Sequence, residues 1–299
     1  MKTFVPHYYS AFNCIAGECR HSCCVGWEID IDPLTLQKYN SIKTPFGKKI
    51  RDNIDFQDGC TCFRLNGDER CPFLNEQNLC DIILSLGEDY LCDICKDHPR
   101  FRNFYSGRTE AGLGLCCEEA CRIILSDEHP FSLVSDDEND EILTEDEQDF
   151  LCRRDLVFNL VENSDSIFTA FRKINEMYKI NPFELDLQTA FDFYSSLEML
   201  DISWKDKLLS LKNSQMVQSD NIAERAFLNL YKYFLFRHLS VFDFYGGLKF
   251  AEISVKLIHS ICERTDFSFK NICETVRMYS SEIEYSDENI DKVTEFAEG

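Results

Sequence analysis

The chain has 299 residues, 44% of them hydrophobic and 28% charged, so it can bury one large core or two ordinary ones. Its formal net charge of -22 argues against a nucleic-acid partner, because binding to phosphates depends on Lys and Arg. We find no apolar stretch with the length of a membrane span or a signal peptide. We therefore expect a cytoplasmic protein with no membrane partner.

Cysteine is concentrated near the start of the chain, where the first 121 residues hold 13 of the 16 cysteines. Four of them, Cys14, Cys19, Cys23 and Cys24, lie within eleven residues. The cytoplasm keeps thiols reduced, so clustered cysteines there indicate a metal or an iron–sulfur cluster rather than disulfides. Thiolates bind zinc, Cu(I) and iron–sulfur centres, and the residue type alone does not separate these.

Residues 1–130 are therefore predicted to form a loop-rich, cysteine-rich metal-binding module with short strands. Its segment WEIDID, residues 27–32, alternates apolar and acidic residues, which predicts a short half-buried strand. The acidic side chains Asp30 and Asp32, and Glu119 further along, are also candidates to receive a cationic substrate group. Both interpretations of the aspartates remain open at this stage.

An acidic linker is predicted at residues 131–149, because residues 135–149 contain nine acidic side chains and no basic one. A docking patch for a lysine-rich protein is the alternative. Residues 150–299 are predicted to form a helical domain, so the fold class is mainly α. A capping box at Thr144 and Glu147 marks the first helix start. Helical periodicity predicts further helices at roughly 165–179, 183–199, 203–212, 221–240, 247–264, 268–280 and 287–297.

Two kinds of S-adenosylmethionine site are disfavoured by the sequence. Cys19 and Cys23 match the first interval of the radical C-x3-C-x2-C motif, but Gly26 stands where the third cysteine is needed. A doubly wound nucleotide fold would need a glycine-rich turn between a strand and a helix. The segment GLGL at 112–115 lacks that frame.

A few other side chains have two possible roles. His21 lies among the first cysteines, where it would complete a Cys3His site or donate to a sulfur. His238 follows Arg237 in an apolar segment, where the two would form a satisfied buried pair or contact a substrate. Glu284 is a weaker acidic candidate of the same kind as the aspartates.

Several blocks of the chain resemble those of the flagellin lysine-N-methylase family, part of a wider group of cysteine-rich zinc- or iron-chelating domains. The resemblance implies methyl transfer from S-adenosylmethionine to the ε-amine of surface lysines on a protein such as flagellin, by a non-radical enzyme that carries a [4Fe-4S] cluster. The blocks, in order, are FNCIAGECRHSCCVGWEIDID, CPFLNEQNLCDI, CKDHPR, LCCEEACRIIL, YFLFRHL at 233–239 and VRMYSSEIEYSDEN at 276–289.

The resemblance also implies a set of eight metal ligands, which is more than one cluster needs. The excess would form a second four-ligand site or remain as packed thiols. The chain departs from the family pattern around Cys116 and at His98, which leaves the ligand set open. A non-catalytic scaffold that binds zinc or iron is the alternative function. The implied ligands are Cys14, Cys19, Cys23, Cys24, Cys71, Cys80, Cys95 and Cys117.

Overall fold

The structure is a computed structural model that describes residues 2–57, 59–135, 142–241 and 243–298. Its packing divides the chain into two compact units, residues 13–100 and residues 1–12 together with 101–299. This division does not fall at the expected boundary near residue 130, because residues 101–125 form strands and a helix that pack within the larger unit. The three-domain assignment itself stays a prediction, and residues 136–141 of the acidic linker lie outside the described part.

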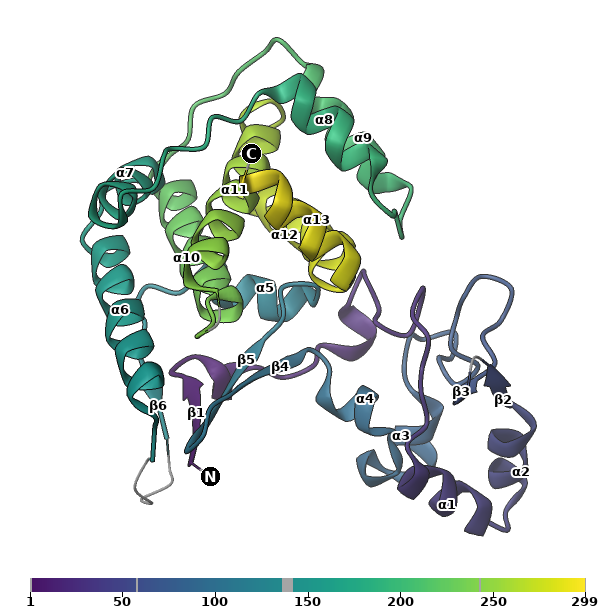
Figure 1. The fold of residues 1–299 in the computed structure, drawn as a ribbon. Coiled ribbons are helices and arrows are strands. Elements are labelled where there is room, and N and C mark those ends of the chain that lie inside the picture. Colours follow the sequence, from purple (N-terminus) through teal and green to yellow (C-terminus); the bar gives the residue numbers. More distant parts are fainter. Residues whose placement is uncertain (1, 58, 136–141, 242, 299) are drawn as a thin grey trace. The chain divides into compact units, whose positions relative to one another are not determined.

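The smaller unit is built from short elements with long irregular connections (Figure 1). Asp32 and Thr44 accept hydrogen bonds from the backbone at the starts of its first two helices, and a proline follows each cap in the first turn. Tyr39, Ile50 and Phe73 are the fully buried centre of a small apolar core. The elements are α1 (Pro33–Ser41), α2 (Pro45–Asp52), β2 (Ile54–Gln57), β3 (Cys60–Phe63), α3 (Asp81–Leu86) and α4 (Asp93–Asp97).

The predicted strand at residues 27–32 is wrong in its secondary structure and right in its burial. Ile29 and Ile31 are buried and Asp30 is exposed, as the alternation indicates. However, the segment pairs with β3 only through an isolated bridge between Asp30 and Cys62. The pairing with β3 does not continue, because Asp32 caps α1 and the next residue, Pro33, has no amide proton to donate.

The larger unit contains a four-stranded sheet in the order β4-β5-β1-β6. Its strands are β1 (Lys2–Pro6), β4 (Arg100–Phe104), β5 (Arg108–Leu113) and β6 (Leu133–Val134). The first strand runs parallel to β5, with Lys2 opposite Arg108, and antiparallel to β6, with Val5 opposite Val134.

Helices make up the rest of the larger unit, and the mainly α fold class is confirmed. The capping box at Thr144 is present, and the helices from α7 to α13 lie close to their predicted spans. One start is displaced, because the helix predicted from about residue 183 begins at Leu187, after the N-cap Asp186. The helices are α5 (Glu118–Leu125), α6 (Glu145–Glu162), α7 (Ile167–Tyr178), α8 (Leu187–Ser196), α9 (Ser203–Leu209), α10 (Asn221–His238), α11 (Phe244–Glu263), α12 (Phe269–Tyr279) and α13 (Asp287–Glu298).

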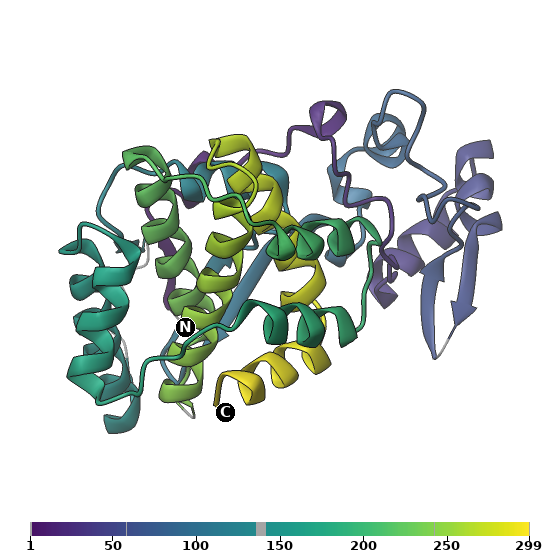
Figure 2. The same cartoon turned by 90° about the horizontal axis from the view of Figure 1, so that it is seen from above.

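Helices α10 and α11 are the centre of this unit, where they lie side by side (Figures 1 and 2). The first also packs against α5 and α6, and the second against α12 and α13. Gly247 permits a close approach, since a Cβ at this position would lie 2.7 Å from the carbonyl oxygen of His238. Among the described helices, none has both the length and the apolar character required to cross a bilayer.

Candidate functional site

Seven cysteines of the smaller unit lie close enough for their charges to act on one another. The charges of Cys14, Cys24 and Cys95 act on Cys23, and those of Cys24 and Cys80 act on Cys71. Cys92 forms a hydrogen bond with Cys95, and the charges of Cys24 and Cys71 also act on Cys95. All 16 cysteines of the chain lie in the described part, and they carry thiols rather than disulfides. The fold therefore gathers distant parts of the sequence into one group of thiols.

Backbone pairing brings these cysteines together. The amide of Cys71 donates to the carbonyl of Cys24 at 2.8 Å, and Val25 and Arg70 form the adjacent bridge. A second bridge joins Leu74 to Cys80, which is the cap residue of α3. Another cysteine, Cys92, is the N-cap residue of α4. Backbone amides of Ile82 and Ile83 donate to the sulfur of Cys80 and act to lower its pKa, but burial outweighs them and raises it.

Protonation of the thiols depends on burial and on their pairing. Burial raises the pKa of Cys71 to about 12, although backbone amides of Phe73 and Leu74 donate to its sulfur and oppose this. The hydrogen bond from Cys23 lowers the pKa of Cys24 to about 7 and raises that of Cys23. The pKa of Cys92 is lowered in the same way by its hydrogen bond with Cys95. Each pair thus has one sulfur suited to bind a metal as thiolate.

The chemistry of this group fits a thiolate-bound metal or cluster, because sulfur is the ligand that zinc and iron–sulfur centres prefer and because Cys71 and Cys80 accept backbone hydrogen bonds. Cys14 and Cys23 are exposed. Sequence reasoning did not include Cys92 in the ligand set, although its C-x2-C spacing to Cys95 was a signal for it. Cys62 differs from the group, because burial and the charges of Glu28, Asp30 and Asp55 raise its pKa. Those carboxylates disfavour a thiolate on the β2–β3 hairpin.

The expected set of eight ligands is divided between the two units. Seven of its members belong to residues 13–100, including the half-buried Cys19. The eighth, Cys117, belongs to the larger unit, where it caps α5. The complete ligand set therefore stays a prediction.

The three acidic candidates have different surroundings. Both carboxylate oxygens of Asp32 accept backbone hydrogen bonds, from Thr35 at 2.9 Å and Asp93 at 3.0 Å. Burial acts to raise the pKa of Asp32, but these hydrogen bonds outweigh it and lower the pKa. Glu119 binds the guanidinium of Arg122 through both oxygens, and Asp30 is exposed. The structure gives Asp32 and Glu119 structural partners, and a catalytic role for any of the three stays a prediction.

A second group of polar side chains surrounds the buried Glu284 in the larger unit. Its Oε1 lies 2.7 Å from Nε2 of His238, and the hydroxyl of Tyr233 donates to the same carboxylate at 3.0 Å. Arg237 donates to the Tyr233 hydroxyl at 2.8 Å and lies 3.4 Å from Glu284. Glu284 ends a π-helical turn, Ser280–Glu284, and such turns are frequent at functional sites.

Burial and neighbouring charges set the protonation states of Glu284 and His238. Burial acts to raise the pKa of Glu284, but the charge of Arg237 and the contact with His238 lower it overall. Burial also lowers the pKa of His238, more than the hydrogen bond with Glu284 raises it. At neutral pH the pair is therefore a carboxylate hydrogen-bonded to a neutral imidazole, an arrangement that orients histidine bases in enzymes.

His238 also lines a pocket of about 350 Å³ in the larger unit. Three carboxylates line the same pocket, Asp243 at the start of α11 and Asp291 and Glu295 on α13. Sequence reasoning had left the role of His238 open. The pocket acids gave no sequence signal, because a carboxylate on a surface helix is ordinary.

Comparison with known proteins identifies relatives among bacterial methylases. The lysine-N-methylases of Salmonella typhimurium strain LT2 and Salmonella choleraesuis strain SC-B67 are each 29% identical to this chain over 139 residues. The chain is a relative of the lysine-N-methylases. The flagellar biosynthetic protein FliU of Salmonella muenchen is 28% identical to this chain over 139 residues.

The similarity to the lysine-N-methylases covers only part of this chain and part of each of those proteins. It covers 43% of this chain and 33% of each of the two Salmonella lysine-N-methylases, about a third of their length. It covers 79% of FliU. No family model matches the chain, and no solved structure matches it.

Proposed function

We propose that this protein is a non-radical lysine N-methyltransferase that uses S-adenosylmethionine and methylates surface lysines of a protein such as flagellin. The relation to the lysine-N-methylases carries this proposal, and the name of FliU supports a flagellar substrate. The pocket beside His238 adds a chemical argument, since three carboxylates there would attract a lysine side chain.

The lysine must lose a proton before it reacts, because a free lysine with a pKa near 10.4 is almost entirely charged at neutral pH. In our proposal, the lysine ammonium enters the pocket and gives one proton to the ring nitrogen of His238 that does not face Glu284. Glu284 stabilises the imidazolium that forms. The free amine then forms a bond to the methyl carbon, the bond from that carbon to the sulfonium sulfur breaks, and S-adenosylhomocysteine leaves.

The group of seven cysteines in the smaller unit would hold a [4Fe-4S] cluster. Four of them, Cys24, Cys71, Cys80 and Cys95, would be its ligands, and Cys14, Cys23 and Cys92 would be further sulfurs nearby. When bound through four cysteines, such a cluster would have no open iron and would stabilise the fold of the smaller unit. Zinc is the alternative occupant, since it accepts the same ligands.

Methyl transfer is tested with labelled S-adenosylmethionine and purified flagellin, followed by mass spectrometry of modified lysines. His238→Asn should lower the turnover rate by about 10²–10⁴-fold, the usual contribution of a positioned base. Glu288→Gln is the matched control, because Glu288 lies on α13 near the pocket acids but pairs with Lys292. Equal rates for His238→Asn and the control would reject the role of His238, and no labelled lysine in any protein tested would reject the activity.

Metal content is tested on protein purified without oxygen. We expect a brown protein with iron, and loss of that iron in Cys71→Ser. The same loss in Cys117→Ser would place that residue in the ligand set as well. A colourless protein with stoichiometric zinc and no binding of S-adenosylmethionine in calorimetry would instead support the scaffold function.

A further inference from the structure

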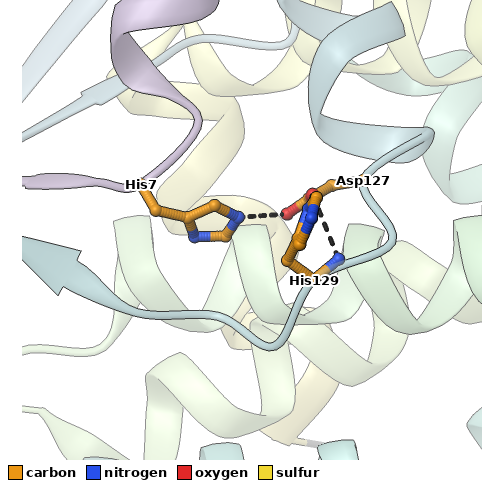
Figure 3. A group of neighbouring side chains, drawn as sticks. All are labelled: His7, Asp127 and His129. Carbon is orange, nitrogen blue, oxygen red and sulfur yellow. Dashed lines mark hydrogen bonds and ion pairs between the residues drawn. The ribbon is translucent and has the colours of Figure 1, made fainter.

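The larger unit contains three metal-ligating side chains that point toward one another, His7, Asp127 and His129 (Figure 3). One ligand atom from each lies within 4.8 Å of the other two. Nε2 of His7 is 2.8 Å from Oδ2 of Asp127, and Nδ1 of His129 is 3.1 Å from Oδ1 of the same carboxylate. The carboxylate thus lies between two imidazoles.

Backbone contacts fix both sides of this group. His7 follows β1, and its amide donates to the carbonyl of Ser132 at 3.0 Å, next to the pairing of β1 with β6. Asp127 follows α5, and the side chain of Asn229 donates to its carbonyl at 2.8 Å and to that of Leu125 at 3.2 Å. The three side chains are therefore brought together by the fold rather than by chance contact of flexible segments.

The two ring nitrogens of His7 are buried and lack hydrogen-bond partners. Both of its nitrogens are shielded from solvent, and neither makes a hydrogen bond of acceptable geometry, even though Nε2 lies so near the Asp127 carboxylate. Shielded polar atoms in proteins almost always have a partner. A cation between His7 and Asp127 would supply one.

The donor set indicates the kind of cation. Imidazole suits zinc, nickel, cobalt and copper, whereas magnesium and calcium prefer oxygen ligands alone. In a tetrahedral zinc site, bonds of about 2.0–2.1 Å place the ligand atoms about 3.3 Å apart. The separations of 2.8 Å and 3.1 Å to the two oxygens of Asp127 are close to this value, and one ligand atom of each residue lies within 4.8 Å of the others.

We propose that His7, Asp127 and His129 bind a divalent transition-metal ion such as Zn²⁺. Three protein ligands leave a fourth position open to water, as in zinc sites that exchange ligands. The ion would join the end of β1 to the loop after α5 and so stabilise the larger unit. This site is independent of the thiol group and of methyl transfer.

The experiment compares full-length variants that retain every cysteine, so that metal held by thiols is the same in all of them. Each protein is dialysed to equilibrium against Zn²⁺, and its zinc and iron are measured by mass spectrometry. The variants are His129→Gln, Asp127→Asn and the control Glu128→Gln. The control removes a carboxylate from the same loop that pairs with Arg225 instead. His129 is 78% exposed at its side chain, so its replacement should not prevent folding.

We expect the wild type and Glu128→Gln to bind one zinc more per chain than His129→Gln and Asp127→Asn. The affinity for that ion should fall at least about tenfold in these two variants, since loss of even an outer partner of a ligand costs 10–100-fold. Zinc should raise the thermal midpoint of the wild type and not that of His129→Gln. Equal zinc in all four proteins overturns the site, and so does an equal loss in Glu128→Gln, which would assign the uptake to the charge of the loop.

Discussion

At the scale of single residues, the buried ion pair between Glu110 of β5 and Arg154 of α6 should be sensitive to mutation. Arg154 donates to both carboxylate oxygens, at 2.6 Å and 2.8 Å, and Arg108 donates to the same group. Neither Glu110 nor Arg154 has appreciable contact with water. The pair joins the sheet to the helices, and its charges depend on each other.

Replacing Arg154 by Met should lower the free energy of unfolding of the larger unit by about 3–5 kcal/mol, because it leaves a buried carboxylate with one partner fewer. Urea titration followed by circular dichroism measures this loss. A loss below about 1 kcal/mol for Arg154→Met would contradict the expected dependence.

His259 should make stability depend on pH. Its imidazole lies among the rings of Phe168, Phe227 and Phe267, with centroids at 5.0, 5.0 and 5.1 Å. Burial lowers the pKa of His259 below its ordinary value of 6.5, more than the charges of Glu263 and Glu224 raise it. The unfolded chain therefore binds the proton first, and stability present above pH 6.5 is lost as the pH falls from there toward the folded-state pKa.

The measurement is the free energy of unfolding between pH 7.5 and 5.5 for the wild type and for His259→Phe. The wild type should lose stability more steeply on acidification, by no more than about 1.4 kcal/mol per pH unit for a single proton. Parallel curves for the two proteins would show that this histidine does not titrate with unfolding.

At the scale of elements, the capping box of α6 is the clearest case in which local sequence specifies structure. Thr144 accepts from the amide of Glu147 at 3.2 Å, and Glu147 accepts from Thr144 at 2.8 Å and from Ser106 at 2.8 Å. Thr144→Ala should lower the free energy of unfolding by about 1 kcal/mol, while Thr144→Ser retains the cap and should change it little. Thermal unfolding of the two variants compares them directly, and equal midpoints would contradict the role of the cap.

Helices were predictable from the sequence because their information is local. The segments 221–240 and 268–280 match α10 and α12 within two residues at each end, since caps and apolar periodicity both lie inside the segment. The alternation at 27–32 predicted burial but not pairing, because pairing depends on β3 and on the turn into α1. Strand pairing requires hydrogen bonds to a second segment, and the sequence of one segment does not show which segment that is.

The candidate sites show the same limit. The cysteine-rich region predicts metal chemistry, which stays a prediction, and the structure brings seven of its thiols into one group in residues 13–100. The C-x2-C spacing of Cys92 to Cys95 was the sequence signal for Cys92, whereas its contact with the rest of the group depends on how the chain folds between residues 71 and 95. The Glu284 group joins α10 to a π-helical turn 46 positions away from His238, a contact that only the tertiary structure reveals.

At the scale of the whole molecule, the two units should differ in their dependence on metal. The smaller unit has a core of few buried apolar side chains, whereas the core of the larger unit extends through nearly all of its helices. Small units with thin cores commonly need a metal to fold.

Removal of metal by a chelator should therefore unfold residues 13–100 and leave the larger unit folded. Limited proteolysis with mass spectrometry should show the first cuts within residues 13–100 after chelation, and few cuts anywhere in the metal-loaded protein. Helical circular dichroism should fall only slightly. Simultaneous cleavage in both parts would indicate that they unfold together.

The parallel pairing of β1 with β5 has a consequence for how this protein is assembled along its chain. Parallel neighbours require a crossover connection, and here that connection carries the entire unit of residues 13–100. The cysteine-rich unit is thus an insertion, held at both ends by one sheet. The entropy of closing a loop grows only slowly with its length, by about 0.6 kcal/mol for each doubling. If the insertion binds a metal as we propose, the sheet would remain closed while that metal is gained or lost, and assembly of the metal centre would not disturb the body of the protein.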